Sequence, residues 1–268
     1  MKNPSWVCTL AVQLTLCLAL YGALRLGQPQ KLICQVGVGS FNVYFISVTG
    51  GFRASRQQTR LLKLMENVAK AYKAEFVLDI TELGEDDPLM QNATELFRSL
   101  EIPWFATRAS KRREAGYFIE QIELPSGNSL DIIGIDTGKL LDSTLMESSR
   151  GTNNSQLNWL TRTLGATDAN WRVVVGFDPL FSCKHNAEQT RGNQVNQLHQ
   201  IFLKFGVNAY LSKQGCTNYA RLFDFLREMA NGFLLHRVSS LEIVTHFVNS
   251  DGEVMCRTRV QQRGREVM

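Results

Sequence analysis

The sequence predicts an α/β protein with a largely parallel sheet, preceded by an N-terminal membrane helix. Three observations lead to this prediction. Apolar runs typical of buried strands alternate with amphipathic helical stretches along most of the chain. Three closely spaced strand patterns follow near the C-terminus, and a nearly uninterrupted apolar run stands near the N-terminus. With 268 residues, 44% of them hydrophobic, the chain is long enough for one sizeable domain with its own core.

The N-terminal apolar run is Trp6–Leu24, in which Gln13 is the only strongly polar side chain. As a helix it would be about 28 Å long, enough to cross the hydrocarbon core of a membrane. A cleaved signal peptide has a shorter apolar region that ends in small residues, whereas this run ends in YGALR. We therefore expect a retained single-pass anchor, with a cleaved signal or a buried core helix as alternatives. The flanking basic residues are balanced, so the orientation stays open, as does the choice between the secretory pathway and the mitochondrial inner membrane.

The chain divides into four predicted parts. Residues 1–27 hold the membrane anchor, 28–41 a linker, 42–262 the folded domain and 263–268 a polar tail. The formal net charge of +4 is spread along the chain rather than gathered in arms, which argues against a nucleic-acid partner. The sequons at Asn92 and Asn153 are about as many as chance predicts, so they do not show that the domain is lumenal.

The cysteines and histidines form no metal-binding pattern. The sequence has no C-x-x-C pair, and its scattered cysteines leave one or two disulfides open. Outside the apolar run they are Cys34, Cys183, Cys216 and Cys256. The four histidines do not cluster in sequence, so we expect packing or surface roles for them.

The elements of the domain follow in order. The first half predicts strands at 42–48, 76–80, from 103 onward and at 116–123, with helices at 57–72 and 92–100. Helix 57–72 places apolar residues on one face, and strand 116–123 alternates as an edge strand does. The second half predicts strands at 130–136, 171–177 and 209–211, helices at 155–164 and 194–205, and strands at 232–237, 241–248 and 254–260. The runs at 130–136 and 171–177 are mostly apolar, which is typical of strands covered on both faces.

This order of pieces resembles the calcineurin-like metallophosphoesterases, and within them the small purple acid phosphatases of the tartrate-resistant type. The resemblance spans residues 42–260. It is carried in order by VTGG, FVLDIT, PWFATRASKRR, LDIIGIDT, SQLNWLTRTL before WRVVVGFDPLFS, FGVNAYLSKQGC and the closing run GFLLHRVSSLEIVTHFVNSDGEVMCRTRV. It implies a four-layer α/β/β/α sandwich, in which two packed sheets are flanked by helices.

In that family a pair of metal ions holds the phosphate and generates the attacking hydroxide, so carboxylate, imidazole and amide ligands stand at the carboxyl ends of the strands. This chain carries other residues at the motif positions. They are Thr49 for the aspartate of G-D-x-G, Glu82 after the second strand, Ser110 and Lys111 within G-N-H-D, Phe177 for a histidine, and Gln214 and Cys216 within G-H-D-H. The resemblance therefore implies the fold, whereas these residues predict no metal, no cofactor and no catalytic residue.

Positive charge near these positions also argues against a metal site, because basic side chains repel a bound cation. The basic residues near these positions are Arg108, Lys111, Arg112, Arg113 and Lys213. Such a run is most often a solvated loop, and its alternative role is contact with an anion or an acidic partner. Cys216 lacks a nearby base in sequence and is not expected to act as a nucleophile.

Three hypotheses follow. The favoured one is a catalytically inactive, membrane-anchored subunit of a membrane protein complex, because every motif ligand is replaced. The second is a metal-dependent phosphatase with a rearranged or single-metal site built from Glu82, Glu85, Asp136 and His185, the last lying in a loop that borders the substrate in relatives. The third is a metal-free anion or phosphate-binding module based on the basic residues named above. In each case we expect the strands ending at Thr49, Ile80, Phe105, Phe177 and Leu211 to converge on one hollow.

Overall fold

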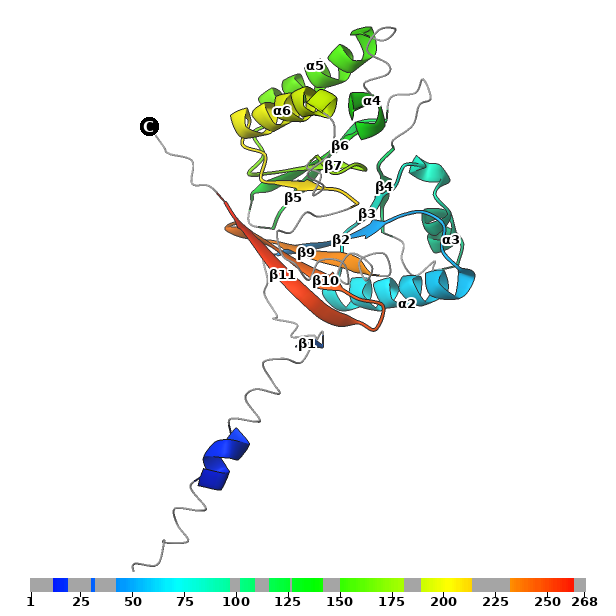
Figure 1. Cartoon of the computed structure of the whole chain (residues 1–268), viewed down its shortest axis with the longest axis vertical. Coiled ribbons are helices and arrows are strands. Elements are labelled where there is room, and N and C mark those ends of the chain that lie inside the picture. Colours follow the sequence, from blue (N-terminus) through cyan, green and yellow to red (C-terminus); the bar gives the residue numbers. More distant parts are fainter. Residues whose placement is uncertain are drawn as a thin grey trace, which may run out of the picture.

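The computed structural model describes residues 12–18, 30–31, 42–96, 102–108, 116–125, 127–141, 150–180, 189–213 and 232–262. Within them the strands form two sheets that pack face to face, with helices on the outer faces (Figure 1). The larger sheet has the order β1-β11-β10-β9-β2-β3-β4, and the smaller has the order β5-β6-β7-β8.

The seven-stranded sheet is mixed. Its parallel part consists of β2 (Val43–Thr49), β3 (Val77–Ile80) and β4 (Trp104–Ala106). Its antiparallel part consists of β9 (Phe233–Val238), β10 (Glu242–Val248), β11 (Glu253–Gln261) and β1 (Gln30–Lys31). The turn between β10 and β11 is closed at Gly252, whose φ of 81° favours glycine.

The four-stranded sheet has three parallel strands and one antiparallel edge strand. The parallel strands are β6 (Ser129–Ile135), β7 (Trp171–Gly176) and β8 (Ala209–Leu211), and the edge strand is β5 (Phe118–Glu123). The helices of the domain are α2 (Ser55–Tyr72), the 3₁₀ turn η1 (Gly84–Asp86), α3 (Pro88–Leu96), α4 (Thr137–Leu141), α5 (Arg150–Ala166) and α6 (Gln189–Lys204).

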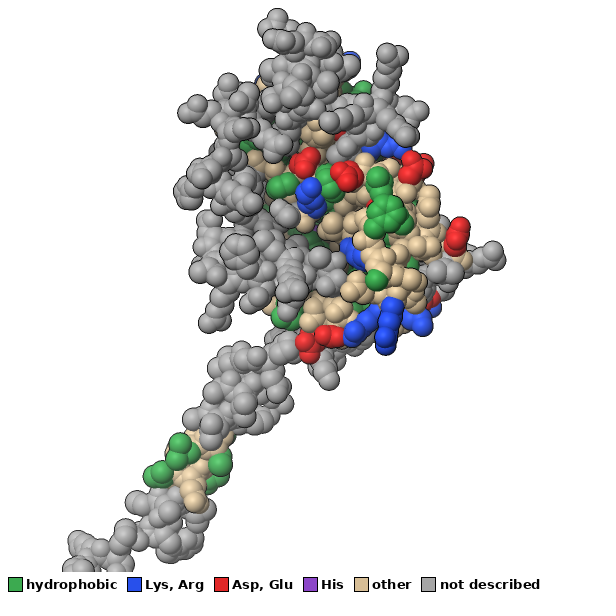
Figure 2. Space-filling model, turned by 45° about the vertical axis from the view of Figure 1, so that its right-hand side comes forward, with side chains coloured by type: hydrophobic (Ala, Val, Ile, Leu, Met, Phe, Trp, Pro, Cys, Tyr) green, Lys and Arg blue, Asp and Glu red, His purple; other side chains and the backbone are tan. Residues whose placement is uncertain are grey.

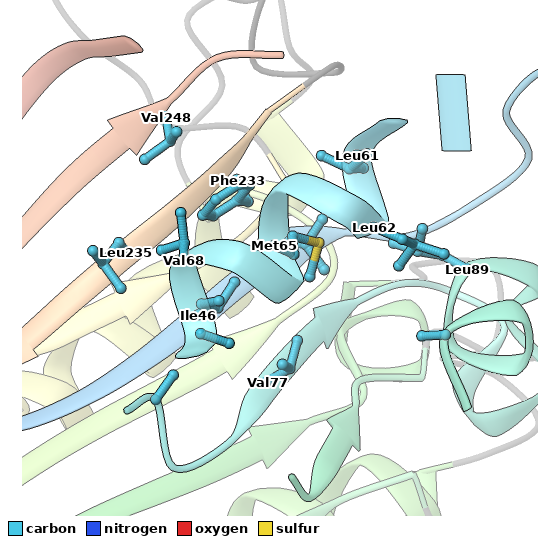
Figure 3. Close-up of a cluster of buried hydrophobic side chains, with 14 residues drawn as sticks. Ile46, Leu61, Leu62, Met65, Val68, Val77, Leu89, Phe233, Leu235 and Val248 are labelled. Atoms are coloured by element: carbon cyan, nitrogen blue, oxygen red, sulfur yellow. The ribbon is translucent and has the colours of Figure 1, made fainter. Parts of the chain in front are cut away.

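Three apolar clusters hold four layers together. Phe45 and Leu78 of the larger sheet meet Ile132 and Trp171 of the smaller sheet in the central layer. On the outer face of the larger sheet, α2 packs through residues spaced three and four apart, and α3 joins this layer (Figure 3). On the outer face of the smaller sheet, α4, α5 and α6 cover Ile133, Ile135 and Val174. The two-sheet α/β architecture expected from the resemblance is therefore present.

His236 of β9 lies inside this core, as its place in an apolar strand predicted. Its ring is within 2.7 Å of Ser47 Oγ and 2.9 Å of Thr245 Oγ1, and it stacks on Phe45. Burial lowers the pKa of His236 to about 3, and the neighbouring His246 adds to this shift. The imidazole is therefore neutral and serves packing.

Predicted and observed elements differ mainly where helices begin. Helix α3 was expected at 92–100 but starts at Pro88, because Asp87 caps it: Asp87 Oδ1 accepts a hydrogen bond from Leu89 N at 2.8 Å. Residues 97–100 lie outside the described residues. Helices α5 and α6 each begin five residues earlier than the apolar pattern indicated. Strand β1 lies in the stretch 28–41 that was expected to be a linker.

The anchor expected at Trp6–Leu24 is described only in part. Residues 12–18 are helical, and Val12, Leu14, Leu16 and Leu18 on this helix are exposed. In the described portion of the chain no helix is both long enough and apolar enough to span a membrane. The membrane anchor therefore stays a prediction.

Candidate functional site

The carboxyl ends of strands from both sheets meet in a small hollow. Thr49 and Ile80 line it at the ends of β2 and β3, and Ser212 lines it directly after β8. The ends of β7 and β8 are joined as well, because Lys213 N donates a hydrogen bond to Phe177 O at 3.2 Å. This is the edge at which open α/β sheets place their functional residues.

The predicted site positions are distributed unevenly around this edge. Thr49 lines the hollow, whereas Glu82 and Glu85 are exposed in the turn and in η1 after β3. Phe177 is half-buried and packs against the core between the two sheets. The remaining positions lie outside the described residues: Ser110, Lys111, Arg112, Arg113, His185, Gln214 and Cys216.

A pair of buried aspartates dominates the β2–β3 side of the site. Asp79 of β3 and Asp87 before α3 are both 0% exposed. Asp87 Oδ2 accepts hydrogen bonds from Gly51 N at 2.7 Å and from Thr81 Oγ1 at 2.6 Å. A Cβ atom on Gly50 would lie 2.5 Å from Asp79 Oδ1 and 2.6 Å from Asp87 Oδ2. The turn after β2 therefore requires glycine, because its backbone lies directly against both carboxyl groups.

Asp79 is the unusual member of this pair. Neither oxygen of its carboxyl group has a hydrogen-bond partner among the described residues. Burial raises the pKa of Asp79 well above its usual range, the charge of Asp87 raises it further, and the charge of Arg53 opposes the shift. The Asp79 carboxyl is therefore protonated under conditions in which an exposed aspartate is ionised.

Arg53 supplies the cation of this cluster. Its Nη2 donates to Thr49 O at 2.5 Å, so the side chain folds back over the turn that follows β2. Burial lowers the pKa of Arg53, and the charges of Asp79 and Asp87 offset part of that shift. The Arg53 guanidinium thus interacts electrostatically with both carboxyl groups of the pair, Asp79 and Asp87.

Sequence reasoning missed both aspartates, although each left a signal. Asp79 is a charged residue inside the apolar strand FVLDIT, and a buried charge in a strand requires an explanation. Asp87 is followed by Pro88, a combination typical of a helix N-cap and first helical residue. The motif comparison favoured Glu82 and Glu85 because they stand nearer the aligned position.

A second cluster surrounds Phe177, where the family has a histidine ligand. The Lys213 ammonium lies 3.7 Å from the centroid of the Phe177 ring and 3.5 Å from Asp178 Oδ1. Asp178 is held in turn by Thr137, whose Oγ1 accepts from Asp178 N at 2.9 Å. Tyr210 donates to Asp178 O at 2.7 Å, and burial, followed by the Asp178 charge, raises the pKa of this phenol. An aromatic ring beneath a cation thus occupies this part of the site.

Arg108 and Asp136 approach each other between the two sheets. Arg108 forms an isolated β-bridge with Leu83, and a Cβ atom on Gly116 would lie 3.1 Å from Arg108 Cβ. The same point is 3.3 Å from Asp136 Oδ2, and Asp136 is completely buried at the start of α4. Arg108 thus connects the turn after β3, at Leu83 and Gly84, with the surroundings of the buried Asp136.

Among the residues that the structure describes, the side chains at this edge do not fit a dinuclear metal centre. In the part of the chain that the structure describes, no three His, Cys, Asp or Glu side chains gather closely enough to hold a metal ion. Thr49 and Phe177 bring no ligand of the required kind, and the Lys213 ammonium stands over Phe177. Asp79 and Asp87 are two carboxyl groups beside a guanidinium, an arrangement that neutralises charge without a metal.

Comparisons with known proteins agree with the fold. No family model and no curated protein matches this chain. Among solved structures, GAP50, the anchor in the inner membrane complex of Plasmodium, aligns with a TM-score of 0.64 and 16% identity over 84% of this chain and 90% of that one. PhoD aligns with a TM-score of 0.50 and 9% identity over 84% of this chain and 69% of that one. At these identities the likeness shows the fold, and the two-sheet architecture matches that of metallophosphoesterases.

Proposed function

We propose that this chain is a catalytically inactive, membrane-anchored protein of metallophosphoesterase fold that serves as a structural or binding subunit of a membrane complex. The observation that carries the proposal is the replacement of donors at the strand ends: Lys213 stands over Phe177 where the family has an imidazole ligand. An ammonium at this place repels a divalent cation, and a phenyl ring cannot coordinate one.

The buried aspartates fit the same proposal. Asp87 has two structural tasks, since it caps α3 and holds the turn after β2 through Gly51 N. Asp79 is kept neutral by burial, and a neutral carboxylic acid is a poor ligand for a cation. Asp87 therefore supports the turn and the helix cap, and the neutral Asp79 presents no negative charge to a cation at this edge.

The proposed anchor is Trp6–Leu24, within residues 1–27, followed by a linker at 28–41, the domain at 42–262 and the tail at 263–268. The likeness to GAP50, an anchor in a membrane complex, supports a structural role and protein partners for this chain. Gln13 within the apolar run adds support, because an amide in hydrocarbon is costly unless it pairs with a neighbouring helix or protein.

The catalytic part of the proposal is tested on the full chain purified in detergent. We expect no stoichiometric metal by elemental analysis and no turnover of p-nitrophenyl phosphate from pH 4 to 8 with iron, manganese or zinc supplied. Stoichiometric metal together with turnover that is abolished by Glu82→Ala or Asp79→Asn would overturn the proposal. Circular dichroism of each variant separates lost activity from lost folding.

The anchor and the partner are tested in membranes. Carbonate extraction is expected to leave the chain in the membrane pellet, and its release would refute the anchor. Lys111→Glu is expected to weaken capture of a co-purifying protein, whereas the matched change Arg162→Glu on the exposed face of α5 leaves capture unchanged. Equal capture of the partner by both variants would show that the basic residues at 108–113 do not form part of the interface.

A second candidate function follows from one observation, the carboxyl oxygens of Asp79 that lack hydrogen-bond partners among the described residues. They would suit a metal-dependent phosphatase with a rearranged site if Asp79 lost its proton to a bound cation. Anion binding by Arg108 and Lys213 receives less support, because Lys213 already pairs with Asp178. Manganese or zinc that raised the melting temperature of the native chain but not of Asp79→Asn would favour the metal site.

A further inference from the structure

The exposed face of α2 carries a continuous stripe of basic side chains. Arg56, Arg60, Lys63 and Lys70 recur at intervals of three, four and seven residues, which places them on one face of the helix, and Lys73 follows at its end. All five are exposed, and the opposite face of α2 is the one buried against the sheet. Figure 2 shows Lys and Arg side chains gathered at the lower edge of the described surface, the end at which Figure 1 places α2.

The acidic groups on this face do not cancel its charge. Glu66 pairs with Lys70 at 2.9 Å, and Asp251 of the β10–β11 turn pairs with Arg60. Five basic residues thus face two acidic ones, which leaves a surplus of three positive charges along the helix. Exposed pairs of this kind contribute little to stability, so the stripe has no evident structural purpose.

This stripe adjoins the point where the N-terminal segment joins the domain. Lys31 of β1 pairs with Glu253, two residues after the Asp251 that contacts α2. A Cβ atom on Gly252, between them, would lie 3.3 Å from Leu64 Cδ1 of α2. Figure 1 places β1 and α2 at the same end of the domain. Strand β1 thus joins the sheet beside α2.

The number of residues between the apolar run and β1 limits how far this end of the domain can lie from a membrane. The apolar run ends at Leu24, and β1 begins at Gln30, so at most about 20 Å of extended chain separates them. We propose that the basic face of α2 contacts the headgroups of anionic phospholipids next to the anchor, which orients the domain on the membrane. This inference rests on the proposed anchor and names the surface that the anchor brings to the lipid. Each basic residue near an anionic membrane adds to the attraction, and the attraction decays within a Debye length.

The test uses the full chain reconstituted into vesicles of phosphatidylcholine alone or mixed with phosphatidylserine. A water-soluble amine reagent modifies exposed lysines, and mass spectrometry reports the rate at each one. We expect labelling of Lys63 and Lys70 to fall about fivefold in the phosphatidylserine vesicles and to recover in high salt. Lys204 at the end of α6, exposed on the opposite outer layer, is the internal control and keeps its rate.

Variants and extraction separate the inference from the proposed function. Lys63→Glu is expected to reduce the protection of Lys70, whereas Arg162→Glu on α5 leaves it unchanged. If Lys63 were labelled equally in both vesicle types while the chain still resisted carbonate extraction, the proposed lipid contact of α2 would be wrong and the membrane anchor would be supported. If Lys63 and Lys70 were protected in phosphatidylserine vesicles but carbonate released the chain, the lipid contact of the basic face would be supported and the membrane anchor would be refuted. Protection that required an added acidic protein rather than lipid would overturn the lipid assignment.

Discussion

Replacing Asp79 with asparagine removes a carboxyl group that the fold keeps protonated. Because burial raises the pKa of Asp79 in the folded state, the folded chain binds a proton that the unfolded chain has already released. The contribution of the native Asp79 to folding stability is thus fully present below about pH 4, where an aspartate in the unfolded chain is also protonated. This contribution is lost as pH rises toward the raised pKa of the folded state. Asparagine has a similar shape and no charge, so Asp79→Asn is expected to gain stability relative to the native chain as pH increases.

The size of this effect follows from the difference of one proton. Each pH unit between about 4 and the raised pKa costs the native protein at most about 1.4 kcal/mol relative to Asp79→Asn. In a domain of this length, that corresponds to at most roughly 3–6 °C in melting temperature per pH unit. Side-chain volume is nearly conserved, so we expect little change from packing.

The assay is thermal unfolding of both proteins at a series of pH values from 4 to 8. The measured quantity is the difference in melting temperature between the variant and the native chain, which cancels the titration of all other groups. Asp86→Asn in η1 makes the same chemical change at an exposed site nearby and is the matched control.

The opposite pH dependence would refute this reasoning. If Asp79→Asn lost stability relative to the native chain as pH rose, the native carboxylate would be ionised and favourably paired in the fold. That result, combined with stabilisation of the native chain by manganese or zinc, would turn the site into a cation site and promote the second candidate function.

Two other predictions concern the core around this site. Because the pKa of His236 falls to about 3 in the folded state, the contribution of its neutral ring to folding stability is fully present above about pH 6.5 and is lost as pH falls. Urea unfolding should show a loss of roughly 2 kcal/mol at pH 5. His236→Phe should abolish this acid-dependent loss, and an unchanged slope would show that other groups cause it. Gly50→Ala should cost about 1–3 kcal/mol in thermal unfolding, because its Cβ would meet three atoms closer than 3.0 Å. Gly165→Ala in α5, with its nearest neighbour at 3.4 Å, is the control and should be neutral or mildly stabilising.

The strands were predictable because burial leaves a direct trace in composition. The run around β7, from Trp171 to Gly176, is apolar except for Arg172, since one face meets the other sheet and the other face meets helices. Strand β1 left no such trace, because its two polar residues join the sheet at the edge of β11 through backbone pairing. Pairing of this kind depends on an available edge rather than on side-chain pattern.

The site was less predictable than the fold. Four acidic residues stand between 82 and 87, and the sequence alone does not say which of them turns inward. The N-cap of α3 decides it, because Asp87 must face Leu89 N, while Glu82 and Glu85 stay in solvent. The sequence locates Asp79 in a strand but does not predict its pKa, because that pKa depends first on burial and then on the charges of Asp87 and Arg53, all of which act only after folding.

The pairing of β1 with β11 also sets the route of a pulling force through the protein. Within the described residues, tension on the chain before Gln30 reaches the domain first at Glu253 and Val254, where β1 contributes two residue pairs. The neighbouring ladder between β10 and β11 involves all seven residues of β10, so under load the short pairing yields first. Once this pairing is released, the load passes along the chain to Val43 of β2, a strand that pairs with β3 on one side and with β9 on the other. The two-residue pairing therefore yields before the force reaches the middle of the larger sheet.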